Sequence, residues 1–72
     1  MMGMDRRELE MLRARFPVGC RVELVRMDDI HAPAPGTQGT VRWVDDIGTI
    51  HVNWDTGSSL GVIYGEDCCK RI

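Results

Sequence analysis

The segment Thr49–Trp54 alternates apolar and polar residues without a break, and this pattern constrains the fold more than any other feature of the chain. Successive side chains of a strand point to opposite faces, so Ile50, Val52 and Trp54 fall on one face. A helix would not bring three residues at a spacing of two onto one side. The pattern therefore predicts a strand with one buried face.

A triplet that ends in glycine lies on each side of this strand, at residues 46–48 and 55–57. The last residue of a three-residue hairpin loop adopts a left-handed conformation, which glycine adopts at little cost. Both triplets also begin with aspartate, whose side chain accepts hydrogen bonds from nearby backbone N–H groups in turns. The sequence therefore predicts antiparallel neighbours on both sides.

Shorter alternating runs predict four further strands, at residues 20–26, 40–44, 59–63 and 69–72. Alternation places Val22 and Leu24 inward on the first of these strands, and Val41 together with Trp43 inward on the second. Five short strands joined by tight turns predict an all-β domain, as a small closed barrel or a strongly coiled sheet.

The first fifteen residues predict one short N-terminal helix. Asp5 is the expected N-cap, and Glu8 three residues later completes a variant of the capping box. Pro17 has no N–H to donate and disfavours helical geometry at Phe16, so we expect the helix to stop there. We accordingly divide the chain into a docking helix, residues 1–16, and a β domain, residues 17–72.

The spacing of Leu9 and Leu12 places both side chains on one face of this helix. A helix of about ten residues is not stable alone in water, so this face must dock. It docks either on the sheet of its own chain or on a partner, which includes a second copy in a homodimer. In the first case the face is structural, and in the second it is a contact site.

Length and composition exclude several classes of protein. The chain has 72 residues and a net charge of −2, and no run approaches the ~18 apolar residues of a membrane span. Three cysteines, two of them adjacent, are not the even and spaced set of a small secreted domain. No basic and apolar leader is evident. We therefore expect one cytoplasmic domain with reduced thiols and no membrane association.

The residues also resemble a known family. The matching frame is Pro17-x-Gly19-x-Arg21-Val22-x-Leu24, then Gly36-x-x-Gly39-x-Val41, then Val44-Asp45-Asp46-x-Gly48-x-Ile50-x-Val52-x-Trp54-Asp55-x-Gly57-x-x-Leu60, and Asp67. This frame is similar to an uncharacterised bacterial family, domain of unknown function 4314, over Phe16 to Ile72. The resemblance implies a small SH3-like barrel with no established activity. The opening glycines also look like KOW and Tudor-type barrels, at the level of the fold.

The residues that could support metal or nucleophilic chemistry do not form a recognisable motif. They are Cys20, Cys68, Cys69, His31 and His51, and no C-x-x-C or H-x-x-x-H spacing occurs among them. Alternation turns His51 outward as a solvated sheet residue, and neither histidine has an evident orienting partner for a thiolate. We expect no cofactor, no metal and no enzymatic activity.

Nucleic-acid binding is the alternative function, by analogy with KOW barrels. Phosphate contacts require clustered basic residues, but residues 16–72 carry five basic against eight acidic residues. The remaining basic patch is Arg21, Arg42, Lys70 and Arg71. Binding of proline-rich peptides requires an aromatic groove, and both tryptophans are expected inside. We therefore rank nucleic acid below a protein partner.

The positions of the acidic residues carry the main functional hypothesis. In an up-and-down meander, alternate connections share one end, so the second and fourth connections should form one acidic rim: Asp45, Asp46, Tyr64, Glu66 and Asp67. The first connection, with Asp28 and Asp29, should lie at the other end. Carboxylates beside an aromatic ring suit a lysine or arginine of a partner. We expect a non-catalytic interaction module that binds a protein through this rim, through Leu9 and Leu12, or through both.

Overall fold

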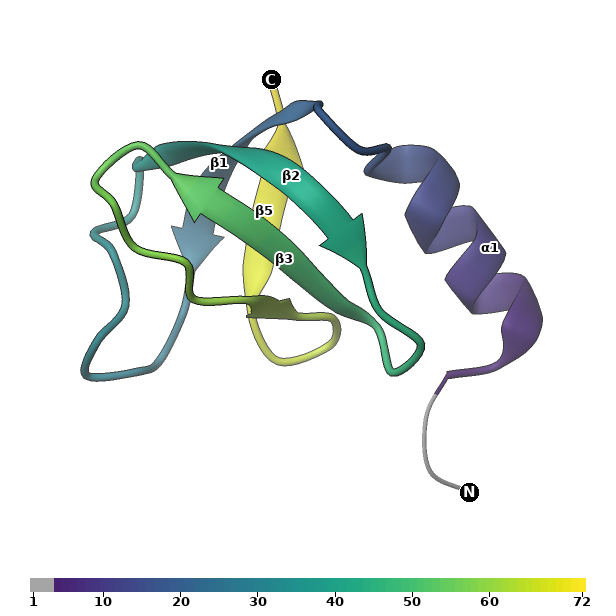
Figure 1. Cartoon of the computed structure of the whole chain (residues 1–72). Coiled ribbons are helices and arrows are strands. Elements are labelled where there is room, and N and C mark those ends of the chain that lie inside the picture. Colours follow the sequence, from purple (N-terminus) through teal and green to yellow (C-terminus); the bar gives the residue numbers. More distant parts are fainter. Residues whose placement is uncertain (1–3) are drawn as a thin grey trace.

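The structure, a computed structural model, describes residues 4–72. It contains one helix, α1 (Arg6–Arg15), and five strands: β1 (Arg21–Arg26), β2 (Gln38–Val44), β3 (Thr49–Trp54), β4 (Val62–Ile63) and β5 (Cys68–Arg71) (Figure 1). The predicted order of one short helix and five strands is confirmed. The first three residues of the predicted helical segment lie outside the described residues.

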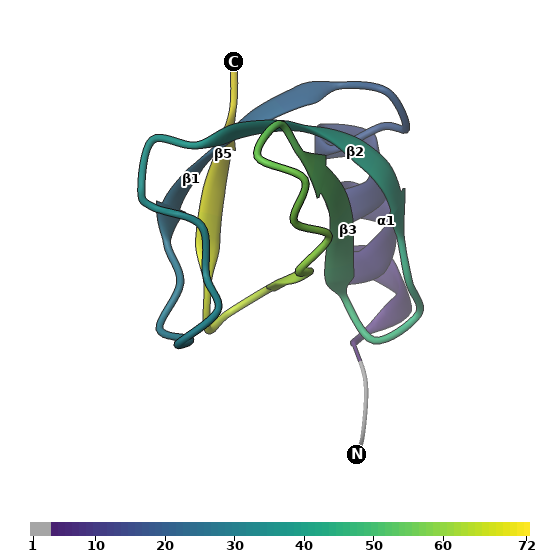
Figure 2. The same ribbon diagram turned by 60° about the vertical axis from the view of Figure 1, so that its left-hand side comes forward.

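The strands form one antiparallel sheet in the order β4-β3-β2-β1-β5. Figure 2 shows that this sheet is strongly curved, with β2 arching between β1 and β5 on one side and β3 on the other. In the part of the chain that the structure describes, no strand pairing joins β4 to β5, and the isolated bridge between Tyr64 and Asp67 lies within the short connection between these strands. The fold is therefore a coiled sheet with a helix, and the predicted closure of a barrel is not established.

Both glycine-terminated turns have the predicted geometry. Gly48 and Gly57 have φ angles of 87° and 98°, which lie in the left-handed region. Asp45 N–H donates to Thr49 O at 3.0 Å and closes the first hairpin around a three-residue loop. These turns set the register in which β3 presents its apolar face.

The core confirms the alternation of β3. Ile50, Val52 and Trp54 are all buried, and the Trp54 indole N–H donates to Leu60 O at 2.8 Å. That hydrogen bond matters because a buried polar group without a partner would be destabilising. The other buried hydrophobic residues are Leu12, Phe16, Val22, Leu24, Val41, Val44, Val62 and Cys69.

The prediction that Trp43 points inward is wrong. The register between β2 and β3 shifts between Val41 and Trp43, which marks a β-bulge or similar irregularity. An extra residue on one strand reverses the faces of the residues that follow it. Trp43 is consequently 49% exposed, and Val44 takes the next buried position.

The helix docks on its own chain. Leu12 and Phe16 are buried in the core, and Leu9 packs against it while partly exposed. Arg13 reinforces the contact, since its Nε and Nη2 donate to Val44 O at 3.1 and 3.0 Å. The helix lies beside β2 (Figure 1). The helix ends at Phe16 as predicted, whereas Asp5 makes no side-chain capping hydrogen bond.

Candidate acidic groove

The structure divides the predicted acidic rim between two places. β1 is antiparallel to both β2 and β5, so β4 and β5 run in the same direction, and the chain is not a simple up-and-down meander. The fourth connection is a short turn of residues 64–67, in which the N–H groups of Glu66 and Asp67 both donate to Ile63 O. It starts beside the β2–β3 turn, where Tyr64 N–H donates to Gly48 O, and ends where Cys68 pairs with Arg26 at the end of β1.

Asp45 organises its own hairpin. Its Oδ1 accepts hydrogen bonds from the N–H groups of Ile47 and Thr49 at 3.1 and 2.8 Å, and its Oδ2 lies 2.9 Å from His51 Nε2. Partial burial acts to raise the pKa of this carboxyl, but the hydrogen bonds from His51, Thr49 and Ile47 outweigh it and hold the pKa below its usual value. Asp45 therefore serves the local structure of the turn.

Two other members of the predicted rim face the helix. Asp46 Oδ1 accepts from Arg13 Nη2 at 2.9 Å, which links the hairpin to α1. Tyr64 lines a small hollow beside Met11 and Arg15 of α1. Asp46 is thus tied to the helix, whereas Tyr64 also stays next to Asp67, with which it forms an isolated β-bridge and lines a second small hollow.

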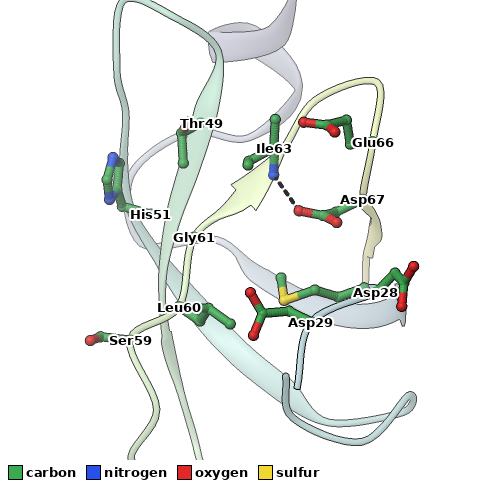
Figure 3. Close-up of a pocket in the computed structure, with 11 residues that line it drawn as sticks. Asp28, Asp29, Thr49, His51, Ser59, Leu60, Gly61, Ile63, Glu66 and Asp67 are labelled. Atoms are coloured by element: carbon green, nitrogen blue, oxygen red, sulfur yellow. Dashed lines mark hydrogen bonds between the residues drawn. The ribbon is translucent and has the colours of Figure 1, made fainter. Parts of the chain in front are cut away.

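Glu66 and Asp67 instead line a groove with Asp28 and Asp29, the pair that we expected at the opposite end. We call this feature the acidic groove. It has a volume of about 410 Å³, and Met27, Leu60 and Ile63 contribute apolar surface to it. In Figure 3, Asp29 and Asp67 point toward the groove, and His51 stands across it from the acidic residues.

The charge of the acidic groove is not neutralised within the described residues. No salt bridge joins any of its four carboxylates to a basic side chain there. Asp67 accepts from Ile63 N–H at 2.9 Å and Asp29 accepts from His31 N–H at 2.8 Å, so both are held in place by backbone groups. The groove therefore combines fixed negative charge with exposed apolar surface.

His51 connects the acidic groove to an exposed tryptophan. Its imidazole stacks on the Trp43 ring with centroids 4.7 Å apart and planes at 13°. His51 thus lies on the outer face of the sheet, as alternation predicts, but it is half-buried and held by Asp45 and Trp43 rather than simply solvated. Trp43 itself was missed as a surface residue. The spacing of three between the buried residues Val41 and Val44 was the signal that strict alternation breaks.

The cysteines and the remaining histidine do not converge on a site. Among residues 4–72, no group of three or more potential ligands is arranged to hold a metal ion. Cys69 is buried, and this burial raises the pKa of its thiol to about 11, whereas Cys68 is exposed. His31 is exposed in the first connection. A buried thiol that stays protonated is a poor nucleophile.

The predicted helix contact site is mostly internal. Leu12 is only 2% exposed, so it is a core residue and not a free contact surface. Leu9 is partly buried against the same core. Met11 is the exposed large hydrophobic residue of α1, at 62%. The structure therefore selects docking within the chain, the first of the two possibilities that the sequence left open.

A family model described as a domain of unknown function, DUF4314, matches residues 5–72. The match covers the helix and all five strands. No curated protein and no solved structure gives a match. Within the described residues, no helix is long and apolar enough to cross a membrane.

Proposed function

We propose that this chain, which belongs to the DUF4314 family of domains of unknown function, is a non-catalytic interaction module that binds a protein partner in the acidic groove. The observation that carries the proposal is the set of four carboxylates, Asp28, Asp29, Glu66 and Asp67, around exposed apolar surface. A segment with lysine or arginine side chains complements both properties, because the aliphatic stems of these residues cover apolar surface while their charges meet carboxylates.

Two finer statements belong to the same proposal. We infer that the coiled sheet is of the SH3-like type, which its strong curvature supports. We also propose a location in the bacterial cytoplasm, because three free thiols suit a reducing compartment. The role in binding does not depend on either statement.

Nucleic-acid association remains the alternative function, and the basic residues argue against it. Arg13, Arg21 and Lys70 each pair with a carboxylate of the same chain. A phosphate backbone would have to displace these pairs and would meet the charge of the acidic groove. Micromolar binding to random oligonucleotides that collapses steeply with salt would favour this alternative.

The test uses a hexalysine peptide as the probe. We expect it to bind the intact chain at low salt, and we expect the variant with Asp29→Asn and Glu66→Gln to bind it about 5- to 10-fold more weakly. Two lost charges at 5–10 Å in water correspond to roughly that change. Asparagine keeps an acceptor for the His31 N–H, so the loop conformation is preserved.

The matched control carries Glu8→Gln and Glu10→Gln on the exposed side of α1, which changes the net charge equally. We expect this control to bind hexalysine within about 2-fold of the wild type, since screening limits charges that lie beyond ~10 Å. Equal weakening in both variants would assign the binding to net charge alone and would remove the groove from the proposal.

A further inference from the structure

Trp43 presents one free ring face on the outside of the sheet. The residue is 49% exposed, and the stacked His51 ring covers one face of its indole. The exposed part is therefore the opposite face together with the ring edge. A tryptophan with one face covered and one face free can stack on a further planar group.

The position of this ring is fixed by its neighbours. The irregularity in β2 turns Trp43 outward, and the His51 ring beneath it is held by Asp45 Oδ2 at 2.9 Å. The Asp45 carboxylate is itself fixed by the N–H groups of Ile47 and Thr49. Little side-chain freedom is lost when such a preorganised ring binds a ligand.

The same stack borders the acidic groove. His51 lines the groove on the side opposite the carboxylates (Figure 3). The face of its ring lies on Trp43. A segment that occupies the groove and continues past His51 therefore reaches the indole. The order along its path is carboxylates, apolar surface, and then the aromatic ring.

We infer that the partner segment carries an arginine whose guanidinium stacks on the free face of Trp43. This inference rests on the proposed function, because the acidic groove selects a cationic segment. Guanidinium is planar and weakly hydrated, so it stacks on an indole better than the compact ammonium of lysine. A nucleic-acid base would also stack, but its phosphates would approach Asp29, Glu66 and Asp67. The charge of the groove favours the polypeptide.

Hexa-arginine and hexalysine peptides test the inference on the intact protein. Trp54 is only 3% exposed, so a change in tryptophan fluorescence on binding reports on Trp43. We expect hexa-arginine to alter this fluorescence and to bind about 3- to 10-fold more tightly than hexalysine. Trp43→Leu should abolish the preference and leave the affinity for hexalysine within about 2-fold. Trp43→Tyr should retain most of the preference.

Equal affinities for the two peptides, or a preference that survives in Trp43→Leu, would overturn the arginine site. If the variant with Asp29→Asn and Glu66→Gln still binds hexalysine more weakly than the wild type does, the proposed function stands without the arginine site. If neither peptide binds at low salt, both fail. If Trp43→Leu does not fold, the arginine site is tested by the fluorescence change of the wild type and by the peptide preference of Trp43→Tyr.

A single-stranded oligothymidylate tests whether Trp43 binds nucleic acid instead. Binding of this probe with a change in Trp43 fluorescence, in the absence of peptide binding, would assign the ring to nucleic acid and overturn the inference. Arg42 is exposed beside Trp43 and has no salt-bridge partner within residues 4–72. Arg42→Gln should therefore weaken oligothymidylate binding if it occurs, but it should not weaken hexa-arginine binding.

Discussion

The imidazole of His51 lies almost flat on the indole of Trp43, with ring centroids 4.7 Å apart and an interplanar angle of 13°. The two residues are paired across β2 and β3, and both lie on the outer face of the sheet. Such a pair stabilises the sheet through cross-strand contact. It also leaves a fixed aromatic surface beside the acidic groove, which connects the stability of the hairpin to the proposed binding site.

Replacing Asp45 by alanine should destabilise the hairpin and release the His51 ring. The change removes acceptors for Ile47 N–H, Thr49 N–H and His51 Nε2. We expect the free energy of unfolding to fall by about 1–3 kcal/mol. Urea unfolding followed by circular dichroism measures this loss. Asp28→Ala is the control, and we expect its effect to be within about 0.5 kcal/mol.

The contribution of Asp45 should disappear in acid. Its pKa is lowered in the folded chain, so its stabilisation is present above the unfolded value of about 4 and is lost as the pH falls through the lower folded value. The difference in the free energy of unfolding between wild type and Asp45→Ala should shrink as the pH falls below about 4. A difference that grows in acid would contradict this assignment.

Truncation of Leu12 tests whether the helix docks within the chain. Leu12→Ala should lower the free energy of unfolding by about 2–5 kcal/mol, because it removes a buried side chain and leaves a cavity. Met11→Ala, at an exposed position of the same helix, should change it by less than about 0.5 kcal/mol. If Leu12→Ala and Met11→Ala lowered the free energy of unfolding of the monomeric protein by similarly small amounts, α1 would not contribute to the core.

The adjacent cysteines should differ in reactivity. Cys68 is exposed, whereas burial raises the pKa of the Cys69 thiol to about 11. Iodoacetamide at pH 8 should therefore label Cys68 in the folded protein and reach Cys69 only after unfolding, because the thiolate is the nucleophile. Peptide mass spectrometry with and without urea distinguishes the two sites. Equal labelling in the folded protein would mean that Cys69 is accessible.

Local patterns predicted the strands because alternation and turn chemistry act over a few residues. The burial of Ile50, Val52 and Trp54 and the positive φ of Gly48 follow from that local order. The exposure of Trp43 was not predicted, because an irregularity in the register between β2 and β3 reverses the face on which the residues after Val41 lie. Alternation alone does not locate such a shift.

The acidic groove could not be predicted because it depends on the direction of β5. The counting of alternate connections assumed a meander, in which β5 would run parallel to β1. In the structure β5 is antiparallel to β1, and this brings Asp67 to the groove beside Asp29. Glu66 and Asp67 were therefore identified as candidates, but the sequence did not place Asp28 and Asp29 beside them. Asp46 instead accepts a hydrogen bond from Arg13, which lies 33 residues away in the sequence.

An amide-resolved NMR titration of the intact chain with hexalysine tests the acidic groove most directly. We expect the largest shift changes along the groove, at Asp29, Gly61, Glu66 and Asp67, and only small changes at Glu8 and Glu10 on α1. Shift changes that are largest on the helix, or spread evenly over every exposed carboxylate, would contradict a binding site in the groove.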